Sequence, residues 1–331
     1  MGNPVVAEIR RGPLIESRHR GSIAVVDADG RIVHSVGDVG ALVYPRSAVK
    51  AMQALVLVES GAVGRFALDD EALALACASH GGEPGHVAVA ERMLAAAGLD
   101  ASALECGIHW PSHAPSAQAL ARSGATASAL HNNCSGKHSG FLCAACALGV
   151  EHRGYAKADH PVQRAVKAVL EDLTGIRIAD EHRAVDGCSV PTWALPLSAL
   201  ARGFARFGTG KGLGPERAKA AQRLRAACAA KPWHVAGTGR FCTSVMQHFG
   251  ERVFVKTGAE GVFCGAIPGA GLGVAIKVDD GAARASEVAM AGVIARFVPL
   301  DDKDRTALER LLRPTLRNWN GIEVGAIAPA P

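Results

Sequence analysis

The stretch YPRSAVK at residues 44–50 lies at the boundary between two patterns in the sequence. Before it, SIAVVD (22–27) and RIVHS (31–35) are short apolar runs on either side of an Asp-Gly pair, which is typical of a β-hairpin. After it, apolar residues recur at spacings of three and four, which predicts helices. Pro45 and Ser47 suit a helix start, because proline lacks an N–H that the first turn leaves unpaired and serine can cap that turn. We therefore expect a sheet to give way to helices here.

The same periodicity places helices in the middle of the chain and strands at both ends. Helices are expected over 47–59, 69–78, 86–97, 117–123, 136–147, 162–174, 192–207 and 215–230, strands over 252–256, 262–267 and 273–278, and further helices over 284–297 and 303–312. The simplest packing is an α/β protein of the α+β type, with one antiparallel sheet from both chain ends and an all-helical insertion. We expect residues 1–46 and 231–331 to form the sheet with its covering helices, and residues 47–230 to form the mainly helical region, in one compact catalytic unit.

Composition and charge exclude several classes of protein. Of the 331 residues, 49% are hydrophobic, which is enough for a core and excludes disorder. The net charge is only +5 and aromatic residues make up 5%, which argues against nucleic-acid binding. The most apolar run (140–150) is too short for a membrane span of roughly 18–20 residues, and the N-terminus lacks a signal-peptide pattern. We expect a cytoplasmic protein whose nine cysteines are free thiols or metal ligands.

Ser47 and Lys50 are the first candidates for chemistry. They are three residues apart, so they share a helix face. A serine hydroxyl needs a base to become a nucleophile, and a lysine that is neutral through burial or neighbouring charge can serve. Alone, the pair also fits a helix cap and a solvated lysine. Lys256-Thr257-Gly258 favours the catalytic interpretation, because S-x-x-K at a helix start with K-T-G on a late strand is the signature pair of serine β-lactamases and penicillin-binding proteins.

The loop SHGG (79–82) directly follows an apolar helix. Ser79 can supply a second hydroxyl to the same cleft, with Lys256 as its base. The alternative is a helix C-terminus closed by glycine.

A polar stretch, HNNCSGKHSG (131–140), precedes an apolar helix, and a second short turn, DGCSVP (186–191), follows about fifty residues later. Thiols from two such turns can share a metal ion, and zinc prefers thiolate sulfur. Cys134 and Cys188 are these thiols, and a neutral Lys137 amine can be a third ligand. The alternative is two buried, inert cysteines. The spacing alone does not decide between a metal site and two inert cysteines.

The full set of motifs extends over the chain. It comprises YPRSAVK (44–50), SHGG (79–82), HNNCSGKHSG (131–140), DHPVQ (159–163), DGCSVP (186–191) and VKTGAEGVFCGAIP (255–268). This set resembles the rhizobial-type L-asparaginases, a zinc-containing family. The resemblance implies a serine β-lactamase-like or glutaminase-like fold, and a homodimer that hydrolyses L-asparagine to L-aspartate and ammonia.

The resemblance also implies roles for single residues. The two Ser-Lys tandems of the family fall on Ser47 with Lys50 and on Ser79 with Lys256. Its zinc ligands, completed by a water, fall on Cys134, Lys137 and Cys188. Its active-site arginine and the acidic residue beside the metal fall on Arg46 and Asp186. We expect these two residues to bind the substrate, together with Asn133 and His138.

The expected mechanism is acyl transfer. Lys50 accepts the proton of Ser47, which attacks the side-chain amide carbon, while Ser79 and Lys256 relay the proton to the leaving amine and position water. The sequence does not decide which of the two serines attacks first. Zn²⁺ is expected to anchor the substrate. A glutaminase or a β-lactamase-like acyl hydrolase on the same fold is one alternative, since pockets discriminate a methylene by only about 1–3 kcal/mol. A non-enzymatic zinc or thiol sensor built on Cys134 and Cys188 is the other.

Overall fold

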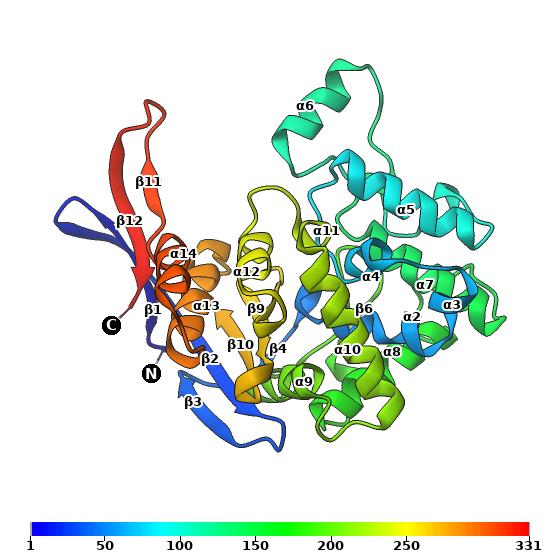
Figure 1. Ribbon diagram of the computed structural model, residues 1–331, viewed down its shortest axis with the longest axis horizontal. Coiled ribbons are helices and arrows are strands. Elements are labelled where there is room, and N and C mark those ends of the chain that lie inside the picture. The colour runs from blue at the N-terminus through cyan, green and yellow to red at the C-terminus, as the bar shows by residue number, and fades with distance from the viewer. Residues whose placement is uncertain (1, 331) are drawn as a thin grey trace. The chain divides into compact units, whose positions relative to one another are not determined.

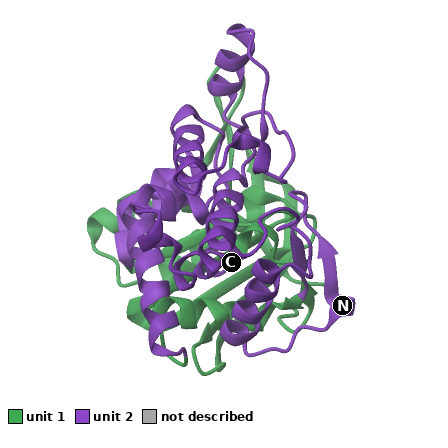
Figure 2. Ribbon diagram, turned by 90° about the vertical axis from the view of Figure 1, so that its right-hand side faces the viewer, with its two compact units in different colours: residues 1–48, 195–212, 252–331 green, residues 49–194, 213–251 purple. Residues whose placement is uncertain are grey.

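The computed structural model describes residues 2–330, and the chain divides into two compact units, which Figure 2 colours separately. Unit 1 comprises residues 1–48, 195–212 and 252–331, so it combines the two ends of the chain with one internal segment. Unit 2 comprises residues 49–194 and 213–251 and contains most of the helices.

Unit 1 is built on an eight-stranded antiparallel sheet (Figure 1). Its strands are β1 (Val5–Arg11), β2 (Leu14–Asp27), β3 (Ile32–Val36), β8 (Phe254–Thr257), β9 (Val262–Ile267), β10 (Leu272–Val278), β11 (Thr315–Arg317) and β12 (Glu323–Pro329). The order is β11-β12-β1-β2-β10-β9-β8, with β3 paired to β2. Strands from the two chain ends meet where β2 pairs with β10, Leu272 lying opposite Asp27. The predicted antiparallel sheet from both chain ends is confirmed.

Helices cover both faces of this sheet. In β9, Gly265 lies near Met290 of α13 (Ala283–Phe297), whereas the next residue, Ala266, lies near Gly208 of α9 (Leu197–Thr209). Successive strand residues point to opposite faces, so the two helices lie on opposite sides. Gly273 of β10 permits the close approach of α9, because a Cβ there would lie 2.0 Å from the Ala201 carbonyl oxygen. Two-sided coverage explains why β9 and β10 read as continuous apolar runs.

A third helix of unit 1, α14 (Asp302–Leu312), packs against α13. It begins at Asp301, whose carboxylate accepts a hydrogen bond from the Asp304 N–H, and the Asp304 carboxylate accepts in return from the Asp301 N–H. Arg252 holds the same Asp304 carboxylate with two hydrogen bonds of 2.8 Å. The expected helices at 284–297 and 303–312 are confirmed.

Unit 2 is mainly helical. It contains α1 (Lys50–Gln53), α2 (Leu55–Glu59), α3 (Ala62–Arg65), α4 (Asp70–Ala76), α5 (Pro84–Ala96), α6 (Ala114–Arg122), α7 (Ser135–Leu148), α8 (Pro161–Thr174), α10 (Pro215–Ala230), α11 (Pro232–Ala236) and α12 (Phe241–Phe249). Helix α7 is its centre, since α2, α4, α5 and α8 all pack against it. Residues 135–145 are buried on every side, including polar ones. Gly136 allows α7 to approach α4, because a Cβ there would lie 2.3 Å from the Leu75 carbonyl oxygen.

Two expectations about secondary structure are wrong, and two helices were not predicted. The helix over 47–59 is divided into a 3₁₀ turn (Arg46–Val49), α1 and α2. Residues 192–196 are extended, as β6 (Pro191–Trp193) and β7 (Leu195–Pro196), because Pro196 cannot continue a helix and marks the start of α9. They pair with β5 (Arg183–Val185) and β4 (Leu42–Val43), respectively. Beyond residue 231 the chain forms two helices, α11 and α12, before its strands.

The sequence of α12 carries a helical pattern of apolar residues. Phe241, Cys242, Val245, Met246 and Phe249 are buried at helical spacing on one face of α12. The shift toward strand composition after residue 231 obscured that short pattern. Among residues 2–330, no helix has the length and apolar character needed to cross a membrane.

Candidate active site

The turn SHGG (79–82) follows α4 and is tied to two other segments of unit 2. The Ser79 N–H donates to the carbonyl oxygen of Val235 at 3.0 Å, and the His80 N–H donates to that of Asn133 at 3.3 Å. These bonds join the turn to the end of α11 and to the polar stretch before α7. The backbone at Ser79 is therefore held from both sides.

Lys50 extends from α1 to this turn and is completely buried. Its Nζ donates to the Ala78 carbonyl oxygen at 2.6 Å, to Ser79 Oγ at 3.0 Å and to the Asn133 carbonyl oxygen at 3.4 Å. Three acceptors match the three N–H groups of a protonated amine. One of the three acceptors is a hydroxyl, that of Ser79, and Cys134 also lies within hydrogen-bond reach of Lys50.

Ser47 lies in unit 1, on the 3₁₀ turn that leads into α1. The residue before it, Arg46, has a φ of +50°, which costs on the order of 1 kcal/mol for a side chain with a Cβ. Strain of this kind is concentrated at functional turns. The K-T-G motif adjoins this turn, because a Cβ on Gly258 would lie 2.9 Å from the Pro45 carbonyl oxygen. Lys256 is buried and donates to the Thr257 carbonyl oxygen at 2.9 Å.

The two predicted cysteines come together with Lys137 inside unit 2. Lys137 Nζ donates to Cys188 Sγ at 3.0 Å, and Cys134 is hydrogen-bonded to Cys188. That bond holds the pKa of Cys134 well below its usual range, and the cations Lys50 and Lys137 act in the same direction. Burial lowers the pKa of Lys137, but the negative charge of the cysteines outweighs it and raises that pKa. The cluster is therefore a cation beside a thiolate, out of water.

Hydrogen bonds hold both cysteine turns, and in the second turn the Asp186 N–H donates to the Val190 carbonyl oxygen at 2.8 Å. Asn132 donates through its side chain to the carbonyl oxygens of Cys106 and Gly107, at 2.9 and 3.1 Å, and accepts from the Cys134 N–H at 2.9 Å. In the second turn Ser189 has a φ of +75°, a strained value for a residue other than glycine. The sequence did not point to Asn132, although an Asn two residues before a loop cysteine is a common turn-forming arrangement.

The residues predicted to bind substrate have different surroundings. His138 is buried, and burial together with the nearby cations Lys137 and Lys50 holds its pKa well below the usual range. The side-chain amide of Asn133 lies 3.0 Å from Cys134 Sγ. Asp186 Oδ2 lies 3.9 Å from Cys188 Sγ. These three residues belong to unit 2 and Arg46 belongs to unit 1.

A stack of rings beside the SHGG turn was not predicted. The rings of His80 and His86 are stacked at 4.8 Å between centroids, and His86 is stacked on Trp233 at 4.0 Å. Burial lowers the pKa of His86 to about 4. Glu83 accepts hydrogen bonds from both the N–H and the hydroxyl of Thr238, which closes the turn against the segment after α11. These contacts join segments that are far apart in the sequence, so no local sequence pattern predicts them.

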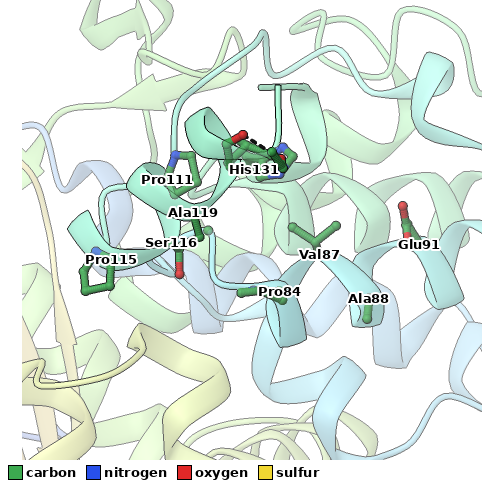
Figure 3. A pocket seen from close by; sticks show the side chains of 12 residues that line it. Pro84, Val87, Ala88, Glu91, Pro111, Pro115, Ser116, Ala119 and His131 are labelled. Atoms are coloured by element: carbon green, nitrogen blue, oxygen red, sulfur yellow. Dashed lines mark hydrogen bonds between the residues drawn. The ribbon is translucent and has the colours of Figure 1, made fainter. Parts of the chain in front are cut away.

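A cavity of about 470 Å³ lies between α5 and α6 (Figure 3). Figure 3 shows Pro84 and Val87 on one side and Pro115 and Ala119 on the other. The lining also includes Gly82 from the SHGG turn, but none of the side chains predicted for catalysis or metal binding. The cavity is therefore not part of the predicted reaction site. Among residues 2–330, no group of three or more His, Cys, Asp or Glu side chains is placed to hold a metal ion.

Comparisons with known proteins bear on the chain as a whole. A search of curated protein sequences found no match. Among solved structures, the chain is similar to Mglu, with 16% identity and a TM-score of 0.40 over 86% of this chain and 69% of that one. It is also similar to a β-lactamase from Mycobacterium bovis, with 15% identity and a TM-score of 0.39 over 84% of this chain and 95% of that one. The family model of L-asparaginase II matches residues 7–329. Since that match covers nearly the whole chain, the protein belongs to the L-asparaginase II family and is an enzyme of the L-asparaginase type.

Proposed function

We propose that the protein hydrolyses the side-chain amide of L-asparagine to L-aspartate and ammonia through an acyl-enzyme formed on serine. Family membership supports the substrate class. The observation that carries the proposal is the buried contact of 3.0 Å between Lys50 Nζ and Ser79 Oγ. A buried lysine in contact with a hydroxyl is placed to carry a proton to and from that hydroxyl.

In the proposed reaction Ser47 is the nucleophile. Lys50 takes the proton from Ser47 as its Oγ forms a bond to the amide carbon, and backbone N–H groups near the helix start stabilise the resulting oxyanion. The proton passes through Ser79 and Lys256 to the amide nitrogen, the C–N bond breaks and ammonia leaves. Water then hydrolyses the ester, which releases aspartate and returns the proton to Ser47.

We also propose that Cys134, Lys137 and Cys188 bind zinc. Thiolate sulfur and amine nitrogen are donors that zinc accepts, and burial together with the contact of 3.0 Å between Lys137 and Cys188 fits a shared ion. Lys137 would hold such an ion as a neutral amine, so its proton would be released on binding. Bound zinc supplies positive charge for anchoring the amino or carboxylate group of the substrate. Asp186, at the edge of the cluster, is proposed to receive the substrate's amino group.

The experiment is a coupled assay of ammonia release, with L-asparagine and L-glutamine side by side. We expect release from asparagine in the wild type and none in Ser47→Ala. Release from glutamine alone would support the glutaminase alternative, and hydrolysis of nitrocefin would support the β-lactamase-like one. A Ser47→Ala variant with near-normal kcat would overturn the assignment of the nucleophile. Zinc-dependent capture of a partner without any ammonia release would favour the sensor.

The family resemblance further leads us to propose a cytoplasmic homodimer. Light scattering coupled to size-exclusion chromatography would measure the assembly, and a mass near twice 34.1 kDa is the expected result. A mass equal to the single chain would contradict it.

A further inference from the structure

Tyr155 and His138 form a buried pair that the proposed mechanism does not use. Tyr155 is one of two tyrosines in the chain and is completely buried. Its hydroxyl lies 2.6 Å from Nδ1 of His138, which is buried in the first turns of α7. The two rings meet edge to face, with planes at 76°. A contact this short, out of water, is a strong hydrogen bond whose direction matters.

A third group decides the direction of that bond. The backbone N–H of Glu105 lies 2.8 Å from the Tyr155 oxygen and can only donate, so the phenol oxygen accepts from it. The phenol hydrogen must then go to an acceptor. Within residues 2–330 the only one in contact with it is Nδ1 of His138. His138 Nδ1 therefore accepts, which leaves the ring neutral with its hydrogen on Nε2.

The hydrogen on Nε2 has no partner. His138 Nε2 is buried and makes no hydrogen bond within the described chain. A buried donor without an acceptor is costly, and in native proteins it is usually satisfied by water or by a ligand. The pair lies near the cysteine and lysine cluster proposed for substrate anchoring, because the charges of Lys137 and Lys50 act on His138 and the charge of Cys188 acts on Tyr155.

We propose that Tyr155 is a positioning residue that fixes His138 as the Nε2–H tautomer, and that His138 thereby donates one hydrogen bond to a carboxylate oxygen of the bound amino acid. The inference rests on the proposed function for the identity of the amino acid. The chain of donors runs from the Glu105 backbone through the Tyr155 hydroxyl to His138. A neutral N–H in this position accepts nothing, so it selects an oxygen over an amino group.

Nitrogen NMR of histidine-labelled protein tests the tautomer directly, with His138→Gln used to assign the signals. In the wild type we expect Nδ1 without a hydrogen and Nε2 with one, and addition of L-aspartate should shift the Nε2–H signal. Tyr155→Phe should make the two tautomers interconvert or reverse. An Nδ1–H tautomer in the wild type, or no change of tautomer in Tyr155→Phe, overturns the role of Tyr155. An Nε2–H signal that aspartate does not shift overturns the role of His138.

Kinetics of His138 variants give a second readout, which does not depend on whether Tyr155→Phe folds. His138→Gln keeps an N–H donor near the position of Nε2, whereas His138→Leu keeps none. We expect the KM for asparagine to rise about tenfold in His138→Leu and less in His138→Gln, with kcat changing less than KM in both. Equal KM values in the two variants overturn the proposal. Cys143→Ala is the control for lost packing in the same buried helix, and it should leave both KM and the tautomer unchanged.

The binding experiment separates this inference from the proposed function. If the wild type releases no ammonia from asparagine but aspartate shifts the Nε2–H signal, the proposed activity fails and the inference stands. If ammonia is released and the signal does not move, the activity stands and the inference fails.

Discussion

Two buried lysines in unit 2 have different surroundings, and we expect them to have different functions. Lys50 and Lys137 are 0% and 2% exposed, and neither is paired with a carboxylate at contact distance in the described chain. Lys50 contacts two carbonyl oxygens and the hydroxyl of Ser79. Lys137 contacts the sulfur of Cys188. Lys50 therefore lies against a hydroxyl and is proposed to transfer a proton, whereas Lys137 lies against a sulfur and is proposed to bind zinc.

The difference follows from where each lysine points rather than from its position in the sequence. Both lysines come three residues after another candidate site residue, Ser47 or Cys134. The Lys50 side chain extends to the SHGG turn, and the Lys137 side chain extends to the turn that carries Cys188. The comparison predicts that the two lysines fail in different ways when they are replaced.

The largest expected effect is on Lys50. We expect Lys50→Met to lower kcat for ammonia release by about a thousandfold, because general acid-base catalysis by a positioned group contributes 10²–10⁴-fold. The thermal midpoint measures whether the fold survives. Lys219→Met, at an exposed lysine in unit 2, is the matched control and should keep full activity. A higher KM with an unchanged kcat would show that Lys50 takes no part in proton transfer. The two lysines would then not differ in function.

Lower pH should destabilise the protein through His86, which lies beside the turn that carries Ser79. His86 is neutral in the folded protein, because burial lowers its pKa to about 4. The unfolded chain binds that proton near pH 6.5, so the stabilisation is complete above that pH and is lost as pH falls toward 4. Between pH 7 and 4.5 we expect a loss of roughly 2–3 kcal/mol in the free energy of unfolding from this group.

Urea unfolding of the wild type and of His86→Gln at the two pH values measures this loss. The variant should lack the part of the pH dependence that comes from His86, although the neighbouring groups His80, His234, His113 and Glu83 contribute to both proteins. If the free energy of unfolding falls equally with pH in both proteins, the ring stack does not stabilise the turn through a neutral His86.

Replacing the second lysine should affect binding more than turnover. We expect Lys137→Met to abolish zinc binding and to raise the KM for asparagine by roughly 10–100-fold, with a smaller fall in kcat, since the ion is proposed to anchor the substrate. Zinc content by atomic absorption and steady-state kinetics test this together. Cys143→Ala removes a buried thiol from the same helix and should keep its zinc. A collapse of kcat equal to that of Lys50→Met would show that the two lysines serve one step.

The smallest expected effect is that of removing the metal itself. Chelation of the wild type should raise KM by about tenfold, and added zinc should reverse the change. The same treatment of Lys137→Met should do nothing further, because its site is already lost. A chelator effect of equal size in both proteins would place the metal somewhere other than the cluster of Cys134, Lys137 and Cys188.

Local patterns predicted much of the fold. The apolar spacing of α10 and α13 and the continuous apolar run of β9 appear in the structure close to their predicted bounds, since each element buries a face that its own sequence displays. The expectation failed at residues 192–196, where Pro196 blocks a helix and the pairing of β6 with β5 and of β7 with β4 holds the chain extended. The pairing of β7 depends on a strand about 150 residues away, which periodicity cannot reveal.

The motifs identified candidate site residues, but they did not show which residues these would contact in the fold. The spacing of Cys134 and Lys137, together with the turn at Cys188, was visible in the amino-acid sequence because thiols and amines in polar turns are candidate metal ligands. The contact of Lys50 with Ser79, the stack on Trp233 and the bond from Tyr155 to His138 emerge only when separate segments pack. The identity of a reactive group is a local property of the chain. Its protonation, tautomer and hydrogen-bond partner depend on groups far along the chain, and tertiary structure alone brings those into contact.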